Sequence, residues 1–130
     1  MACSKASLCN LRKVVKELIS DLRDHVFTAN DEYVDLLFVE MYFDKLPPQE
    51  LMKNMIDRVV PHADMIAGRN ETFFLEHPVL FQDLKADRTQ HYKGFWKDRR
   101  VTAEDKNVIW EYFDTILEIA QNYEAADVEK

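Results

Sequence analysis

One segment near the C-terminal end has an unambiguous helical period and constrains the fold more than any other. Between Thr102 and Tyr123, large apolar residues recur at steps of three and four, and Glu111 and Glu118 are among the polar residues between them. Thr102 and Asp105 have the spacing of a near capping box, which marks a helix start. Because the apolar face is wide, this helix needs packing partners on more than one side. Its apolar residues are Val108, Ile109, Tyr112, Phe113, Ile116, Leu117, Ile119 and Ala120.

Turn-forming residues are scarce in this chain of 130 residues. It contains 2 glycines and 4 prolines, whereas a β-rich fold needs a turn every few residues. Hydrophobic residues make up 47% and charged residues 32%, which is typical of a folded domain. We therefore predict an all-α fold, a compact helical bundle of four main helices plus short helical pieces.

A chain of this length is expected to form one domain. We place this single helical domain at residues 7–123, after a flexible N-terminus at 1–6 and before an acidic tail at 124–130. The core is expected to consist of Leu18, Leu36, Phe38, Ile56, Phe95, Trp96, Trp110, Phe113 and Leu117.

Four further helices are predicted upstream of the first segment. Ser4 or Ser7 is the expected cap of the first of them, and Asn30 or Asp31 is the expected cap of the second. Pro48 suits the first position of the third. Helical periods place these helices at residues 7–27, 31–45, 48–60 and 88–97.

The predicted helix over residues 31–45 is apolar nearly all round. Such a helix is either buried on several sides or partly covered by a partner. Its apolar residues exceed what one buried face needs, so we expect it to bind a protein partner or a second copy of the chain. The candidate partner-binding residues are Val34, Val39, Tyr42 and Phe43.

The net charge of −7 disfavours binding to nucleic acid through the overall field. The segment 93–100 is nevertheless basic and is interleaved with Tyr92, Phe95 and Trp96. We expect the aromatic residues in the core and the cations at a solvated rim. Binding of the cations to nucleic acid or to an acidic partner is the alternative. The basic residues are Lys93, Lys97, Arg99 and Arg100.

The sequence offers no arrangement of residues for catalysis. Gly68 and Gly94 are too few for a phosphate-binding loop, and the Glu-x-x-His motif of di-iron bundles does not occur. The histidines at 25, 62, 77 and 91 do not pair at a metal-binding helical spacing, and Cys3 and Cys9 do not make a disulfide scaffold. We predict a non-enzymatic protein with no cofactor, no metal and no small-molecule substrate.

The chain has no apolar run of about eighteen residues that would predict a membrane span, and its start lacks the apolar core of a signal peptide. With so few cysteines, a reducing compartment fits best. We expect an intracellular protein, in the cytoplasm or nucleus.

Several short motifs follow one another in a familiar order along the chain. They are Asp21-Leu22, Pro61-His62, Phe73-Phe74, Phe95-Trp96 and Ile109-Trp110-Glu111-Tyr112. In this order, from Val14 to Tyr123, the chain resembles a group of short helical proteins encoded by nucleocytoplasmic large DNA viruses, the giant viruses of protists and algae. The motifs are apolar and structural, and the group has no assigned activity. The resemblance therefore carries over no catalytic residue and implies a setting, the infected host cell or the virion.

Together these observations predict a helical interaction or structural module, either a virion component or a protein-binding adaptor, that acts through an apolar and aromatic surface. The alternative is binding of nucleic acid or nucleoprotein through the segment 93–100.

Overall fold

Every regular element that the computed structural model describes, over residues 2–77, 80–81, 83–96 and 101–128, is a helix. The predicted all-α fold is therefore confirmed. The four long helices are α1 (Ala2–Asp21), α2 (Asn30–Lys45), α3 (Pro48–Val59) and α7 (Ala103–Val128). The shorter elements are the π-helix η1 (Leu22–Val26), the 3-10 helix η2 (Val60–His62), α4 (Ala63–Ala67), α5 (Thr72–Glu76) and α6 (Ala86–Phe95).

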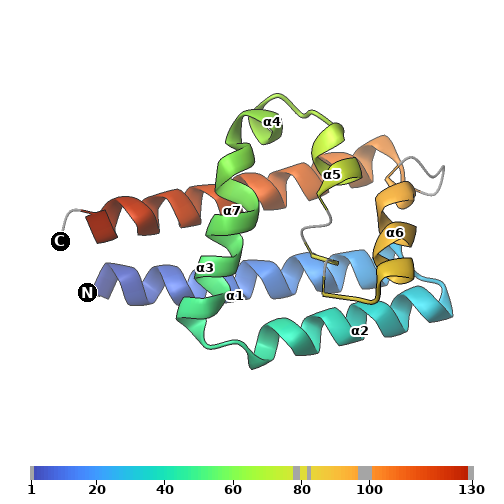
Figure 1. The fold of residues 1–130 in the computed structure, drawn as a ribbon, viewed down its shortest axis with the longest axis horizontal. Coiled ribbons are helices and arrows are strands. Elements are labelled where there is room, and N and C mark those ends of the chain that lie inside the picture. Colours follow the sequence, from blue (N-terminus) through green and yellow to red (C-terminus); the bar gives the residue numbers. More distant parts are fainter. Residues whose placement is uncertain (1, 78–79, 82, 97–100, 129–130) are drawn as a thin grey trace.

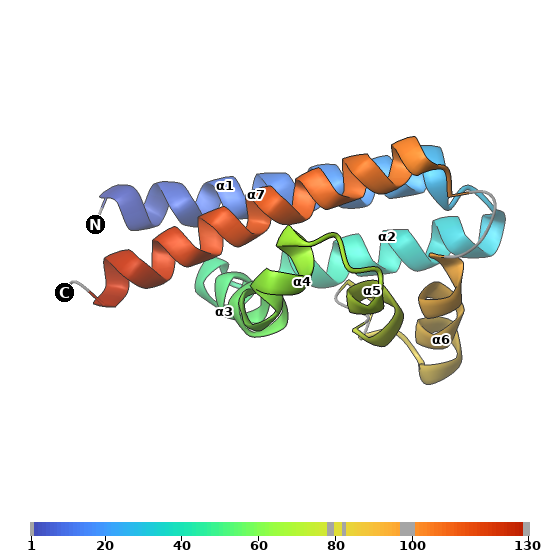
Figure 2. The ribbon, with the colours of Figure 1, turned by 90° about the horizontal axis from the view of Figure 1, so that it is seen from above.

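The long helices set the shape of the molecule. Helices α1 and α7 lie side by side in opposite directions, so α1 begins and α7 ends at the same end of the bundle (Figures 1 and 2). Helix α2 runs back along α1 and η1 at the edge of the bundle, and α3 crosses both α1 and α7. The short helices α4, α5 and α6 lie on the same side of the α1 and α7 pair as α3 (Figure 2). Helix α2 is therefore an edge helix with one outward face.

One continuous core joins these helices. Among the largest fully buried side chains are Phe43 of α2, Phe73 of α5 and Phe113 of α7, and the rings of Phe73 and Phe113 pack edge to face at 5.8 Å. Burying a side chain of this size stabilises the fold by roughly 1.5–3 kcal/mol. The core thus draws on the edge helix, a short connecting helix and the last helix alike.

The predicted core is confirmed for Leu18, Leu36, Trp96, Trp110 and Phe113, which are all buried. It is wrong for Phe38, whose side chain is exposed on α2. The reason is that α2 turns Leu36, Val39 and Phe43 inward, and Phe38 lies on the other side of the helix. The remaining predicted members, Ile56 and Leu117, are half-buried against the core, and the side chain of Phe95 lies outside the described residues.

The helix ends agree with the sequence in part. Thr102 and Asp105 form the predicted capping box, because each backbone N–H donates to the other side chain at 3.1 Å. Pro48 begins α3, as expected. The predicted caps of α2 are wrong, since Ala29 is its N-cap residue.

The start of the first helix and the end of the last helix also differ from the prediction. Helix α1 begins at Ala2, whereas Ser4 or Ser7 was the expected cap, and α7 continues to Val128 through most of the expected acidic tail. Both helices are therefore longer than their apolar stripes indicate.

Candidate interaction surface

Helix α2 presents a row of large apolar side chains to the outside of the bundle. The exposed fractions are 44% for Tyr33, 63% for Val34, 55% for Phe38 and 56% for Met41, and Leu37 lies between them half-buried. These residues recur at three- and four-residue steps, so they share one face of the helix. We call Tyr33, Val34, Leu37, Phe38 and Met41 the α2 face.

The predicted partner-binding residues fall on both sides of α2. Val34 is exposed, as predicted, but Val39 and Phe43 are buried in the core, and the structure corrects the prediction for these two. Tyr42 is half-buried and packs edge to face on Phe43, with the ring centroids 5.3 Å apart. Between residues 33 and 43 every position except Asp35 and Glu40 is apolar, so the helical period did not show which face is turned inward.

Two arginines of the preceding segment hold α2 against the bundle, one at its C-terminal end and one at its middle. At its C-terminal end, Arg12 of α1 donates hydrogen bonds to the backbone oxygens of Asp44, at 2.9 Å, and of Leu46. In its middle, Arg23 pairs with Glu40 at 2.9 Å. These contacts fix the rotation of α2, so the outward direction of the α2 face is set by the fold.

A second set of polar contacts joins the first turns of α2 to α6. Arg88 donates to Asp35 at 2.8 and 2.5 Å and to Asp31 at 3.2 Å, and the hydroxyl of Tyr92 donates to Asp35 at 2.8 Å. The pKa of Arg88 is raised, first by the hydrogen bond with Asp35. Burial and then the Asp35 carboxylate raise the pKa of Tyr92. At neutral pH this cluster therefore holds a charged guanidinium and a neutral phenol.

Glu32 is the charged residue that the sequence interpretation missed. Its side chain is 1% exposed, and its carboxylate lies 2.9 Å from Nε2 of His91 and 3.4 Å from the backbone N–H of Ala29. Glu32 shares the inward spacing of Leu36 and Val39, which was the signal available in the sequence. The contact locks α6 onto the inward side of α2.

Charge is distributed unevenly along α2. Asp31, near its start, is largely exposed beyond its contact with Arg88. Lys45, at its end, is exposed, and Lys16 of α1 contacts the neighbouring Asp44 at 3.4 Å. The α2 face therefore runs from an acidic end to an end that carries cations.

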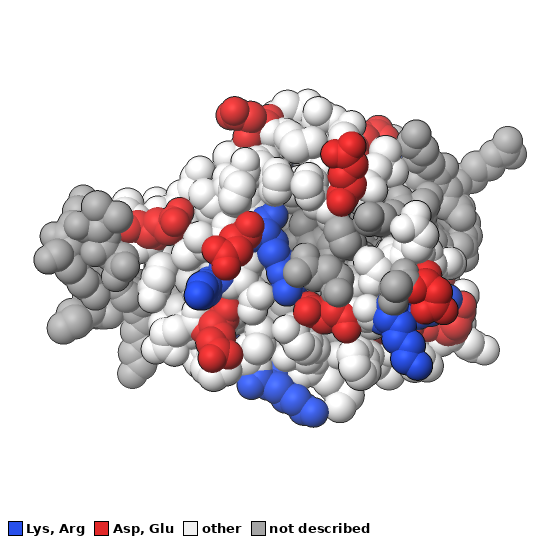
Figure 3. All heavy atoms as spheres, in the orientation of Figure 1, with Lys and Arg blue, Asp and Glu red and all other residues white. Residues whose placement is uncertain are grey.

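The predicted basic patch lies in a part of the chain whose side chains the structure does not describe. Lys97, Arg99 and Arg100 lie outside the described residues, as does the side chain of Lys93. Two aromatic residues of the same segment, Tyr92 and Trp96, are buried in the core rather than free to stack on bases. Among the coloured side chains of Figure 3, acidic and basic groups lie interspersed on the face that it shows.

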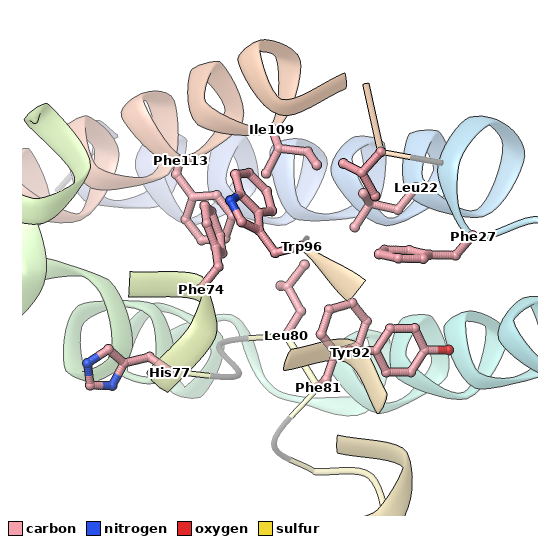
Figure 4. A pocket seen from close by; sticks show the side chains of 11 residues that line it. Leu22, Phe27, Phe74, His77, Leu80, Phe81, Tyr92, Trp96, Ile109 and Phe113 are labelled. Carbon is pink, nitrogen blue, oxygen red and sulfur yellow. The ribbon is translucent and has the colours of Figure 1, made fainter. Parts of the chain in front are cut away.

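An aromatic cavity of about 50 Å³ lies beneath α5 and α6. Figure 4 shows its side chains, with Phe74 stacked on Trp96 at 4.3 Å and Phe81 on Tyr92 at 4.2 Å. An apolar cavity that binds benzene measures about 150 Å³, so this space is too small for a ring. We read it as a packing feature of the core.

Two histidines meet beside this cavity. The rings of His62 and His77 lie 4.0 Å apart, and burial, followed by the charge of His77, lowers the pKa of His62. Within the described ranges, no group of three or more His, Cys, Asp or Glu side chains is arranged to hold a metal ion. A pair of rings alone offers two ligands at most, fewer than the three or four protein ligands of a zinc site.

Comparison with protein-family models, curated proteins and solved structures found no match to this chain. The resemblance to proteins of giant viruses therefore stays a prediction. Among the helices described by the structure, none is long and apolar enough to cross a membrane.

Proposed function

We propose that this protein is a non-enzymatic helical interaction module that pairs with a second copy of itself through the α2 face. The observation that carries the proposal is the uncovered row of Tyr33, Val34, Leu37, Phe38 and Met41 on an edge helix. Contiguous apolar patches of this kind mark sites of protein–protein contact. The resemblance to proteins of giant viruses makes an infected cell or a virion the setting of the same proposal.

Self-pairing fits the order of side chains along α2. Around a two-fold axis near Leu37 and Phe38, antiparallel helices set Val34 of one copy opposite Met41 of the second. The same axis sets Asp31 of each copy opposite Lys45 of the other copy, so the contact contains two such pairs. Opposite charges then meet at both ends of the contact, and the two helix dipoles oppose each other favourably. A parallel pairing would place like charges together.

The energetics predict a weak dimer. Half-burying one of these side chains contributes about 1 kcal/mol, so five from each copy contribute about 10 kcal/mol. Association costs roughly 4–15 kcal/mol in lost freedom of motion. At the low end of that cost about 6 kcal/mol remains, which corresponds to a Kd of about tens of micromolar, so the dimer is expected to be populated at high protein concentration.

Sedimentation velocity over a wide concentration range tests the proposal. The parent chain is expected to shift from monomer to dimer as concentration rises, and Val34→Arg is expected to stay monomeric because it places a cation within the apolar contact. Val108→Arg is the matched control, since Val108 is an exposed apolar residue on α7 rather than α2. A parent chain that is monomeric at every concentration, or equal losses in both variants, would contradict the proposal.

A further inference from the structure

A groove of about 260 Å³ lies where the end of α1 and η1 meet the first turns of α7. These segments lie side by side, away from the end where α1 begins (Figure 2). The floor of the groove is apolar and includes Leu22, Val26 and Ile109. It shares no residue with the α2 face.

The rim of the groove is acidic. Asp21, Glu104 and Asp105 are among the lining residues, and none of the described residues that line the groove is a lysine or an arginine. Asp21 accepts a hydrogen bond from the hydroxyl of Tyr112, and Asp105 accepts one from the backbone N–H of Thr102 at 3.1 Å. A carboxylate has about four acceptor positions, so both retain capacity for a further donor. Glu104 is exposed at the rim.

The groove is bordered by an unusual backbone segment. η1 is a π-helix, in which the N–H of Phe27 donates to the oxygen of Leu22 at 2.7 Å, and Leu22, His25 and Val26 of this segment all line the groove. π-helical turns are rare and occur frequently at functional sites. The hydrogen bond between Tyr112 and Asp21 also joins the two walls, because it links α7 to the end of α1.

We propose that this groove binds a cationic amphipathic peptide segment of a partner protein. An aliphatic side chain of the peptide enters the apolar floor, and a lysine or arginine next to it meets the carboxylates of Asp21 and Glu104. Phosphate groups are disfavoured by the same carboxylates, which argues against nucleic acid as the occupant. The net charge of −7 adds long-range attraction for a basic segment.

The size of the groove agrees with this occupant. Pockets for drug-sized ligands measure about 300–1,000 Å³, so this groove suits one or two side chains of a peptide rather than a whole cofactor. A peptide that lies along the groove also keeps its backbone in water, where its polar groups stay hydrated. The chemistry required is therefore one aliphatic and one cationic side chain in neighbouring positions.

Isothermal titration with two capped peptides tests the inference, one alternating leucine with arginine and one alternating leucine with glutamate. The basic peptide is expected to bind and the acidic peptide to show no heat. Val108→Arg, which places a cation at the groove, is expected to weaken binding more than about tenfold, whereas Val34→Arg on the α2 face leaves it unchanged. The two sites are thereby separated, because each variant disables one and spares the other.

A second pair of variants distinguishes binding in the groove from attraction by the net charge of the protein. Glu104→Gln is expected to weaken binding of the basic peptide about two- to fivefold, the value of one exposed charge pair. Glu118→Gln removes the same charge from an exposed position elsewhere on α7 and is expected to have no effect. Equal binding of both peptides, or equal losses in both Glu→Gln variants, would overturn the inference. So would amide shifts in a labelled sample that map outside η1 and the start of α7.

Discussion

The guanidinium of Arg69 donates two hydrogen bonds to the carboxylate of Asp114, at 2.8 and 2.7 Å, and thereby joins the turn after α4 to α7. Arg69 adopts φ of 54°, in the left-handed region that is costly for a residue with a side chain. The same guanidinium donates to the backbone oxygen of Ile66 at 3.1 Å and lies over the ring of Trp110 at 5.5 Å. The side chain therefore compensates for a backbone strain that it also causes.

This arrangement predicts an unusual order of stability at position 69. Arg69→Ala loses the contacts with Asp114 and keeps the strained backbone, so we expect it to lower the free energy of unfolding by about 1–2 kcal/mol. The exposed ion pair supplies only part of that loss. Arg69→Gly loses the same contacts but relieves the strain, so we expect it to be about 1 kcal/mol more stable than the alanine variant. Urea unfolding measures both, and an alanine variant at least as stable as the glycine variant would contradict the assignment of strain.

The contact between His62 and His77 predicts a dependence of stability on pH. The pKa of His62 is lowered from 6.5 in the folded protein, first by burial and then by His77. The unfolded chain therefore binds the proton more readily, so the stability linked to His62 is complete above about pH 6.5 and is lost as pH falls below it.

Urea unfolding at a series of pH values between neutral and mildly acidic checks this dependence. The parent chain is expected to lose stability over that range, and His62→Gln is expected to lose less. His25→Gln is the control, because His25 is exposed and belongs to η1, whereas His62 and His77 belong to η2 and the end of α5. An unchanged pH slope in His62→Gln would show that other groups dominate acid sensitivity.

The contact between Glu32 and His91 predicts an asymmetry between two substitutions. His91→Leu removes the group that lies 2.9 Å from the buried carboxylate of Glu32, so we expect a loss of about 2–4 kcal/mol. Glu32→Leu leaves His91, which is partly exposed and can be hydrated, so we expect a loss of less than about 1 kcal/mol. Unfolding of both single variants and the double variant measures the difference. Equal losses would mean that the pair contributes through packing rather than through charge.

The helical period was sufficient to predict α2 and α7 as helices, and the spacing of Thr102 and Asp105 was sufficient to predict the cap of α7. The inward face of α2 could not be predicted in the same way, because apolar residues occupy all but two of the positions from 33 to 43 and therefore lie on every side of the helix. Glu32 was overlooked because a carboxylate is expected in water, although its spacing to Leu36 places both on the inward face. Sequence spacing identifies which residues share a face, but only tertiary packing decides which face is covered.

The groove and the strained turn depended on contacts that the sequence does not specify. The groove exists because the end of α1 lies beside the start of α7, and η1 widens the helix there. No residue pattern in the sequence marks the π-helix, so Leu22–Val26 was predicted as part of an ordinary α-helix. At the turn after α4, the left-handed residue is Arg69 rather than the neighbouring Gly68, which no propensity would indicate.

The antiparallel pairing of α2 predicts a charge-reversal effect. Lys45→Glu sets an acidic side chain opposite Asp31 of the second copy at both ends of the contact, so dimerisation is expected to weaken about two- to tenfold. Adding Asp31→Lys in the same chain recreates opposite pairs in reversed order and is expected to restore most of the affinity. Sedimentation equilibrium at low and high salt measures the effect, which should shrink as salt screens the charges. If the double variant dimerised no better than Lys45→Glu alone, the two ends of α2 would not meet, and a parallel arrangement of the helices would account for the dimer instead.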